Sequence, residues 1–147
     1  MRITCLVDNT ARRGSRLWAE HGLAFLIESG TGRVLFDTGQ SGTVLVHNLD
    51  VLGVDPGTID ALAISHAHYD HVGGLPALLE RTRPGLPMCA HPDLFRERFS
   101  QRQGEPMAKS IGLRLTREAL AARTRLHLST EPQEIVPGVW TTGEIVS

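Results

Sequence analysis

Four side chains able to bind a metal ion lie within six consecutive residues: His66, His68, Asp70 and His71. In an extended backbone alternate side chains point the same way, so His66 and His68 can approach one ion. Asp70 and His71 follow where the chain turns, and they can reach a second ion nearby. Neutral imidazole and carboxylate groups suit zinc, and they also accept manganese or iron. The spacing therefore predicts a site for two divalent ions, with zinc as the expected metal.

The sequence around this segment predicts how it is held. Residues 59–65 (IDALAIS) indicate a buried strand, and residues 66–74 indicate a polar loop that ends in Gly73 and Gly74. A loop rooted on a buried strand can adopt the geometry that ligands require. We interpret the two glycines as small residues at a sharp bend into a helix over about residues 76–83.

The rest of the chain predicts a mixture of strands and helices. Alternating apolar residues near the start place Ile3, Cys5 and Val7 on one face of a strand. Polar residues 101–115 indicate a surface excursion. Strands are expected over residues 2–8, 22–28, 33–37, 59–65, 87–90, 125–128, 134–136 and 139–142, and helices over 43–52, 76–83, 93–100 and 116–123. Hairpins followed by alternating strands and helices favour a layered α/β (α+β) domain, with helices covering a mixed sheet.

The composition narrows the classes of function. The chain has 147 residues, which suits one domain over residues 1–147. Its net charge of −1 and aromatic content of 5% give no indication of nucleic-acid binding. No apolar run approaches the ~20 residues of a membrane span, and the start lacks the features of a signal peptide. We therefore expect a cytoplasmic protein that acts on a small molecule rather than on nucleic acid or a membrane.

The H-x-H-x-D-H pattern of residues 66–71 also resembles the sequence signature of a known family. Following an apolar strand, and preceded by Asp37-Thr38-Gly39, it resembles the signature of the metallo-β-lactamase superfamily. Five segments together resemble one branch of that superfamily: VDNT at 7–10, EHGLAFLIE at 20–28, LFDTGQSG at 35–42, SHAHYDHVGGL at 65–75 and TTGEI at 141–145. That branch consists of metal-dependent hydrolases, and it includes pterin-linked ribofuranosylaminobenzene-phosphate synthases.

The resemblance implies a fold and a role for each matched residue. The fold is the N-terminal half of an αββα sandwich. His66 and His68 are implied as ligands of a first ion, and Asp70 and His71 as ligands of a second. Asp70 would also be catalytic, by orienting a metal-activated water. Asp37 would brace the ligand loop through hydrogen bonds, although a purely turn-forming role is an alternative.

Other polar residues near the motif have two interpretations each. His21 and Tyr69 either line the pocket beside the metals or serve as ordinary loop and packing residues. The loop arginines Arg12, Arg13 and Arg16 could meet an anionic substrate, although a solvated loop is the better interpretation.

The chain also departs from the superfamily pattern. The second half of the fold normally supplies a further His, a bridging Asp and a final His. The downstream histidines here are His91, expected to cap a helix, and His127, expected in a strand; neither lies in the glycine-rich context of those ligands. A metal-dependent hydrolase, a pterin-branch synthase and a truncated non-catalytic module therefore all remain open. We also expect the isolated chain either to associate with itself or to expose an apolar sheet face.

Overall fold

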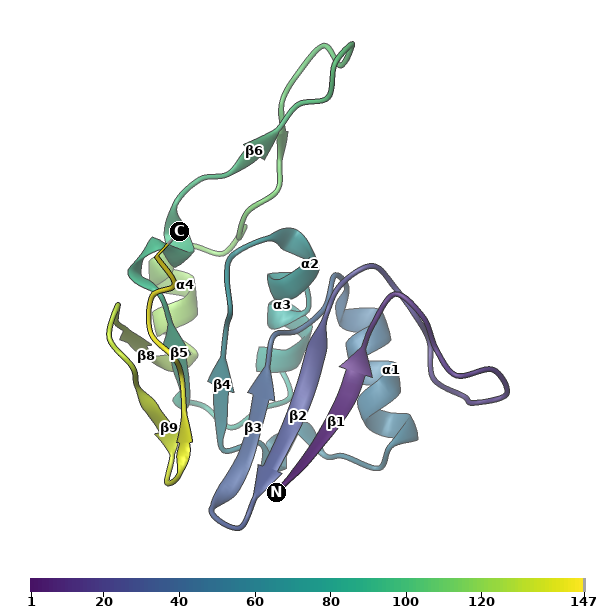
Figure 1. Cartoon of the computed structure of the whole chain (residues 1–147), viewed down its shortest axis with the longest axis vertical. Helices are drawn as coiled ribbons and strands as arrows, with labels where there is room; N and C mark the ends of the chain where they lie inside the picture. Colours follow the sequence, from purple (N-terminus) through teal and green to yellow (C-terminus); the bar gives the residue numbers. More distant parts are fainter. Residues whose placement is uncertain (147) are drawn as a thin grey trace.

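Six strands form one mixed sheet in the computed structural model, which describes residues 1–146 (Figure 1). The sheet order is β1-β2-β3-β4-β5-β8. Its strands are β1 (Arg2–Val7), β2 (Ala24–Ser29), β3 (Gly32–Phe36), β4 (Ala61–Ala63), β5 (Leu86–Ala90) and β8 (Thr124–Leu128). β2 pairs antiparallel with both β1 and β3, and a short turn joins it to β3, whereas β3, β4, β5 and β8 are parallel. Parallel neighbours need a crossover, and helices supply it.

The helices are short, and the first is the longest. The α-helices are α1 (Gly42–Val51), α2 (Tyr69–Val72), α3 (Leu75–Leu79) and α4 (Arg117–Ala121), and two 3-10 turns are η1 (Pro56–Thr58) and η2 (Pro92–Phe95). At the start of α1, the Ser41 side chain accepts a hydrogen bond from the backbone of Val44. Gly53 follows the helix with a φ of 67°, a conformation that favours glycine and ends the helix.

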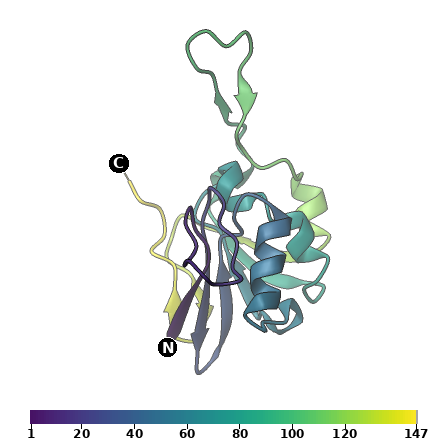
Figure 2. The same ribbon diagram turned by 90° about the vertical axis from the view of Figure 1, so that its right-hand side faces the viewer.

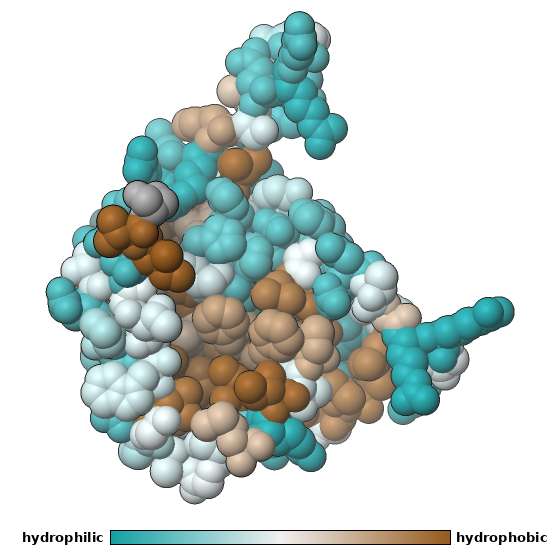
Figure 3. All heavy atoms as spheres, in the orientation of Figure 1, coloured by the Kyte–Doolittle hydropathy of each residue, from teal (hydrophilic) through white to brown (hydrophobic). Residues whose placement is uncertain are grey.

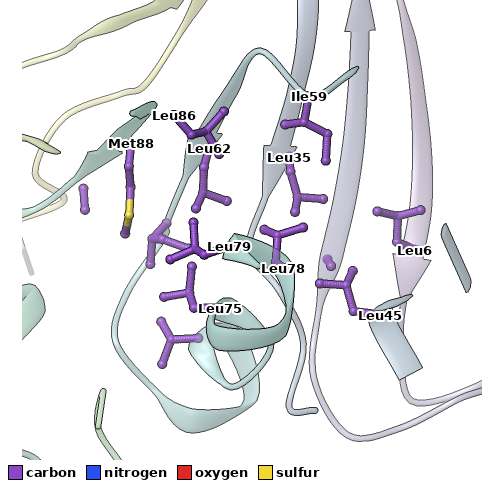
Figure 4. Close-up of a cluster of buried hydrophobic side chains, with 14 of the residues drawn as sticks. Leu6, Leu35, Leu45, Ile59, Leu62, Leu75, Leu78, Leu79, Leu86 and Met88 are labelled. Atoms are coloured by element: carbon purple, nitrogen blue, oxygen red, sulfur yellow. The ribbon is translucent and has the colours of Figure 1, made fainter. Parts of the chain in front are cut away.

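The main core lies between the helices and one face of the sheet. Leu75, Leu78 and Leu79 of α3 point toward sheet residues that include Leu35 and Leu62 (Figure 4). All five leucines are buried. Burying each such side chain contributes about 1.5–3 kcal/mol. This packing fixes α3 against the sheet, and so fixes the loop that precedes it.

A small hairpin covers part of the opposite sheet face. It consists of β9 (Glu134–Val136) and β10 (Val139–Trp140), and Val139 packs against Val34, Ala63 and Cys89. Figure 2 shows the α1 side and this hairpin on opposite sides of the sheet. Beyond the hairpin the same face carries further apolar side chains, of which Ile3 is 61% exposed. Figure 3 shows apolar side chains gathered on this face.

The predicted mixed sheet covered by helices is confirmed, but the predicted face of β1 is partly wrong. Ile3 and Cys5 are exposed, whereas Leu6 and Val7 are both buried. The pairing of β1 with β2 shifts register between Cys5 and Val7. Such a bulge breaks the alternation of side chains, so the simple two-residue period fails there.

Two predicted helices differ in the structure. The helix expected over 93–100 is wrong: η2 ends at Phe95, and Phe99 begins a strand. That strand, β6 (Phe99–Ser100), pairs with β7 (Lys109–Ser110) in an arm that extends from the body (Figures 1 and 2). The helix expected over 76–83 is shorter, spanning α3, and the expected loop 66–74 contains the additional turn α2.

Across residues 1–146, no helix combines the length and the apolar character needed to cross a membrane.

Candidate metal centre

The histidine-rich segment leaves the sheet at the carboxyl end of β4 and continues into α2. His68 is the residue before the helix, with extended backbone angles of φ −73° and ψ 145°. Asp70 and His71 lie within the four residues of α2. The segment thus combines a non-helical part, which carries His66 and His68, with a helical turn, which carries Asp70 and His71. This division agrees with the spacing argument made from the sequence.

Three imidazole rings gather above this edge of the sheet. The ring centroids of His66 and His68 are 4.6 Å apart, and those of His66 and His71 are 4.2 Å apart. Partial burial, followed by the nearby charges of His71 and His68, lowers the pKa of His66. A lowered pKa favours neutral imidazole, which is the form that binds a metal ion.

The carboxylate of Asp37 accepts hydrogen bonds from both ends of the histidine-rich segment. Its side chain is fully buried, and its φ of 58° is the one positive value among the non-glycine residues of 1–146. Oδ1 accepts a hydrogen bond from the Ser65 amide at 2.8 Å, and Oδ2 accepts one from the Ser65 hydroxyl at 2.6 Å. Oδ2 also lies 2.7 Å from Nδ1 of His71. Because a carboxylate only accepts, that Nδ1 carries the hydrogen, and Nε2 of neutral His71 is left with a lone pair.

The loop after β3 packs closely against the histidine-rich segment and the two glycines that follow it. The amide and hydroxyl of Thr38 both donate to the carbonyl of His71, each at 2.8 Å. Gly73 and Gly74 form the turn between α2 and α3, where the sequence predicts a bend, with φ values of −64° and −83° that do not themselves require glycine. A Cβ on Gly73 would overlap the carbonyl of Gln40, and one on Gly74 would overlap that of Thr38. The glycines are needed for close approach of two backbones.

Asp70 faces two ring nitrogens. Its Oδ2 is 3.5 Å from Nε2 of His71 and 3.3 Å from Nε2 of His21. The structure thus brings His21 to the site from the loop between β1 and β2. Tyr69 is 41% exposed, and its ring centroid lies 6.1 Å from that of His21.

The donor set suits divalent ions in its chemistry. Within residues 1–146, no three His, Cys, Asp or Glu side chains are already arranged as a group that could hold an ion. The groups present are nevertheless imidazole nitrogens and a carboxyl group, and the contact with Asp37 leaves Nε2 of a neutral His71 ring as an acceptor. His66 and His68 lie on the non-helical part and Asp70 and His71 on the helical turn, so the four residues fit two ions better than one.

A cavity of about 580 Å³ opens beside His66, between the sheet and the β9–β10 hairpin. Phe36 and Cys89 are among its apolar lining residues, and His91 and Arg98 are among its polar ones. His91 caps η2, as expected, by accepting a hydrogen bond from the Asp93 amide at Nδ1. Its Nε2 is buried and lies 3.4 Å from Oε1 of Glu144 without forming a hydrogen bond to it. The cavity therefore joins apolar walls to a few polar groups near the candidate ligands.

Sequence reasoning missed several supporting residues. Ser65, Thr38 and Asn9 all make hydrogen bonds that position the candidate ligands or their loops. Thr38 lies within the Asp37-Thr38-Gly39 motif and Ser65 directly precedes the H-x-H-x-D-H pattern, and those positions were the available signal. Asn9 lies in the VDNT segment at 7–10, but the sequence did not indicate its contact with His21, because that contact joins two ends of a loop.

The mixed sheet and the His-Asp cluster at the end of β4 point to one class of protein, and a family comparison identifies it. The family model of the metallo-beta-lactamase superfamily matches residues 17–145, and the chain belongs to that superfamily. It is 32% identical over 149 residues to the Methanocaldococcus jannaschii 7,8-dihydropterin-6-methyl-4-(beta-D-ribofuranosyl)-aminobenzene-5'-phosphate synthase. That match covers 99% of this chain and 51% of the synthase. An uncharacterized protein of the same organism is 32% identical over 143 residues, covering 97% of this chain and 53% of the relative.

Solved structures agree on the fold. A quorum-quenching N-acyl homoserine lactone lactonase matches with a TM-score of 0.53 and 20% identity, covering 80% of this chain and 48% of the lactonase. The metallo-β-lactamase MIM-1 of Novosphingobium pentaromativorans matches with a TM-score of 0.52 and 22% identity, covering 78% and 41%. The chain spans about half the length of the curated relatives it matches.

Proposed function

We propose that this chain contributes to a metal-dependent hydrolase that uses a metal-activated water. The observation that supports this most is the gathering of His66, His68 and His71 beside Asp70 at the end of β4. His66 and His68 would hold a first ion, and Asp70 and His71 a second. Divalent ions held there, zinc above all, would make water a nucleophile at neutral pH.

The chain's own residues have distinct parts in this proposal. Asp37 fixes the ring of His71 and the start of the segment through Ser65, so the ligands are oriented before any ion arrives. Asp70 would orient the attacking water as well as bind an ion. The cavity beside His66 would receive a small-molecule substrate. Arg98 lines it and makes no ion pair with a carboxylate within residues 1–146, which supports a substrate with an anionic group.

A second candidate is a pterin-branch synthase activity on a ribofuranosylaminobenzene-phosphate-like substrate. It is favoured by the 32% identity with the Methanocaldococcus jannaschii synthase along 99% of this chain. A third is the non-catalytic module that the sequence leaves open. These candidates share the metal residues, so a metal measurement precedes any choice among them.

The first test is metal content per chain by elemental analysis, after purification from metal-supplemented medium, with His68→Ala alongside. The proposal expects about two ions per chain, with fewer in the variant. Hydrolysis of lactone, β-lactam and phosphodiester substrates is then compared with formation of the product of the synthase. Absence of metal in the wild type would contradict the hydrolase and favour the non-catalytic module. Metal with synthase turnover alone would favour the second candidate.

A further inference from the structure

A histidine outside the H-x-H-x-D-H segment faces the same carboxylate as the last histidine of that segment. Nε2 of His21 lies 3.3 Å from Oδ2 of Asp70, and Nε2 of His71 lies 3.5 Å from that oxygen. We propose that His21 is a ligand of the same metal ion as Asp70 and His71. This inference rests on the proposed metal site and adds to it a residue from a different part of the chain.

The hydrogen bonds at the far side of each ring fix which nitrogen is available. Oδ1 of Asn9 accepts a hydrogen bond from the amide of Gly22 at 3.2 Å, which identifies it as the amide oxygen. Nδ1 of His21 lies 3.1 Å from that oxygen and therefore donates to it. His71 is arranged in the same way, with Nδ1 donating to Asp37. When each ring is neutral its lone pair is therefore on Nε2, and both Nε2 atoms face Asp70.

The distances from Oδ2 of Asp70 to the two ring nitrogens suit ligands of one ion. Two donors on a tetrahedral zinc ion, each about 2.0–2.1 Å from the metal, are roughly 3.3–3.4 Å apart. The two distances to Asp70 lie at or near that separation. Within residues 1–146, neither of these two contacts with Asp70 is a hydrogen bond. A nitrogen lone pair that faces a carboxylate oxygen is repelled by it unless a cation lies between them.

The loop that carries His21 is hydrogen-bonded to the histidine-rich segment. The amide of Leu23 donates to the carbonyl of Asp70 at 3.3 Å. Gly22 has a φ of 141°, and a Cβ there would overlap that same carbonyl. On the other side, the carboxylate of Glu20 accepts hydrogen bonds from the amides of Gln40 and Ser41 at 3.0 and 2.9 Å. The backbone on both sides of His21 is therefore held against Asp70 and against the loop before α1.

An ion pair between protonated His21 and Asp70 is the competing explanation, and it predicts the opposite effect on metal binding. If His21 is a ligand, its removal weakens the ion that Asp70 and His71 share. If His21 is only a cation beside Asp70, its removal frees the carboxylate, and metal binding stays the same or becomes tighter. The sign of the change therefore separates the two.

The test is titration of the full chain with Co²⁺, followed by calorimetry and by visible absorption, which reports the ligand geometry of cobalt. Wild type is compared with His21→Ala, His71→Ala and the control His127→Ala, which removes an exposed histidine of β8. We expect His21→Ala and His71→Ala to weaken the same binding step at least about tenfold and to change its absorption. His127→Ala should bind as the wild type does.

Circular dichroism melting checks that each variant is folded, which is expected because His21 is exposed on a surface loop. Binding by His21→Ala that matches or exceeds the wild type, beside weakened binding by His71→Ala, would overturn this inference alone. Failure of the wild type to bind Co²⁺ would overturn both the inference and the proposed metal chemistry.

Discussion

Nδ1 of His71 donates a 2.7 Å hydrogen bond to Oδ2 of Asp37, a fully buried carboxylate at the end of β3. The two residues are 34 positions apart in the sequence, and the parallel pairing of β3 with β4 brings them together. The same carboxylate accepts two hydrogen bonds from Ser65. One side chain therefore sets both the start of the ligand segment and the ring orientation of a candidate ligand.

Asp37→Asn is expected to weaken metal binding. Asparagine tolerates the positive φ at this position, but its amide has one acceptor oxygen for the three donors that Asp37 now accepts. We expect zinc affinity to fall about 10–100-fold and the free energy of unfolding to fall by about 1–3 kcal/mol. A competition titration with a chelating dye measures the affinity, with Asp50→Asn on the exposed side of α1 as the control. Unchanged affinity would mean that Asp37 only shapes the turn.

Gly73→Ala is expected to destabilise the fold without any change in charge or catalytic groups. The added methyl group would overlap the carbonyl of Gln40, and both backbones are held by neighbouring hydrogen bonds. We expect a loss of about 1–3 kcal/mol or more, measured by urea unfolding. Gly30→Ala is the matched control, because a Cβ there meets nothing within 4 Å. Equal stability of the two variants would show that the crossing of the loops can relax.

The sequence predicted the sheet class and the ligand segment because both depend on local patterns. Apolar runs indicated the buried strand β4, and four side chains of metal-binding types within six residues predicted a metal site. The details that failed depend on contacts between distant segments. Phe95 and Phe99 have helical spacing, but Phe99 pairs with Ser110 in the arm instead. The bulge in β1 likewise depends on its pairing with β2.

The site residues that the sequence left open also depend on contacts between distant segments. The sequence left two interpretations of His21 open, because its approach to Asp70 depends on how the loop before β2 folds over α2. The glycine pair was expected at the bend before α3, but its second role was not: Gly73 and Gly74 also allow two loops to cross closely. Local sequence can indicate which residues are chemically capable, whereas the crossing of loops decides which of them meet.

Glu28→Gln is expected to reduce the dependence of stability on acid pH. The hydrogen bond from Arg2, with further contributions from the charges of Arg2 and Arg33, lowers the pKa of Glu28 from its ordinary 4.5. The folded state therefore binds this proton less readily than the unfolded state does. The stabilisation is complete above pH 4.5 and is lost as the pH falls through the lowered pKa of the folded state.

Urea midpoints on either side of pH 4.5 test this prediction. The wild type should lose more stability on acidification than Glu28→Gln does, and the exposed Glu131→Gln should behave like the wild type. Parallel pH profiles for wild type and Glu28→Gln would show that solvent screens these ion pairs completely.

Ile3→Lys is expected to reduce self-association or dye binding by the isolated chain. Ile3 is 61% exposed on the edge strand β1, and it pairs with Ile27 on the sheet face that the β9–β10 hairpin leaves open. Edge strands with exposed apolar side chains favour association, and a lysine there opposes it by its charge and hydration. Because Ile3 is exposed, the free energy of unfolding should change by no more than about 0.5 kcal/mol.

Sedimentation velocity over a range of concentrations, together with binding of an apolar-surface dye, measures both effects. Gln103→Lys in the exposed arm adds the same charge away from the sheet and should leave both unchanged. A wild type that is monomeric and binds no dye would contradict the prediction, because the remaining apolar side chains of this face would then be too dispersed to act as one surface. Association that persists in Ile3→Lys would instead locate the contact away from β1, with the apolar Phe99 and Met107 of the arm as the next surface to test.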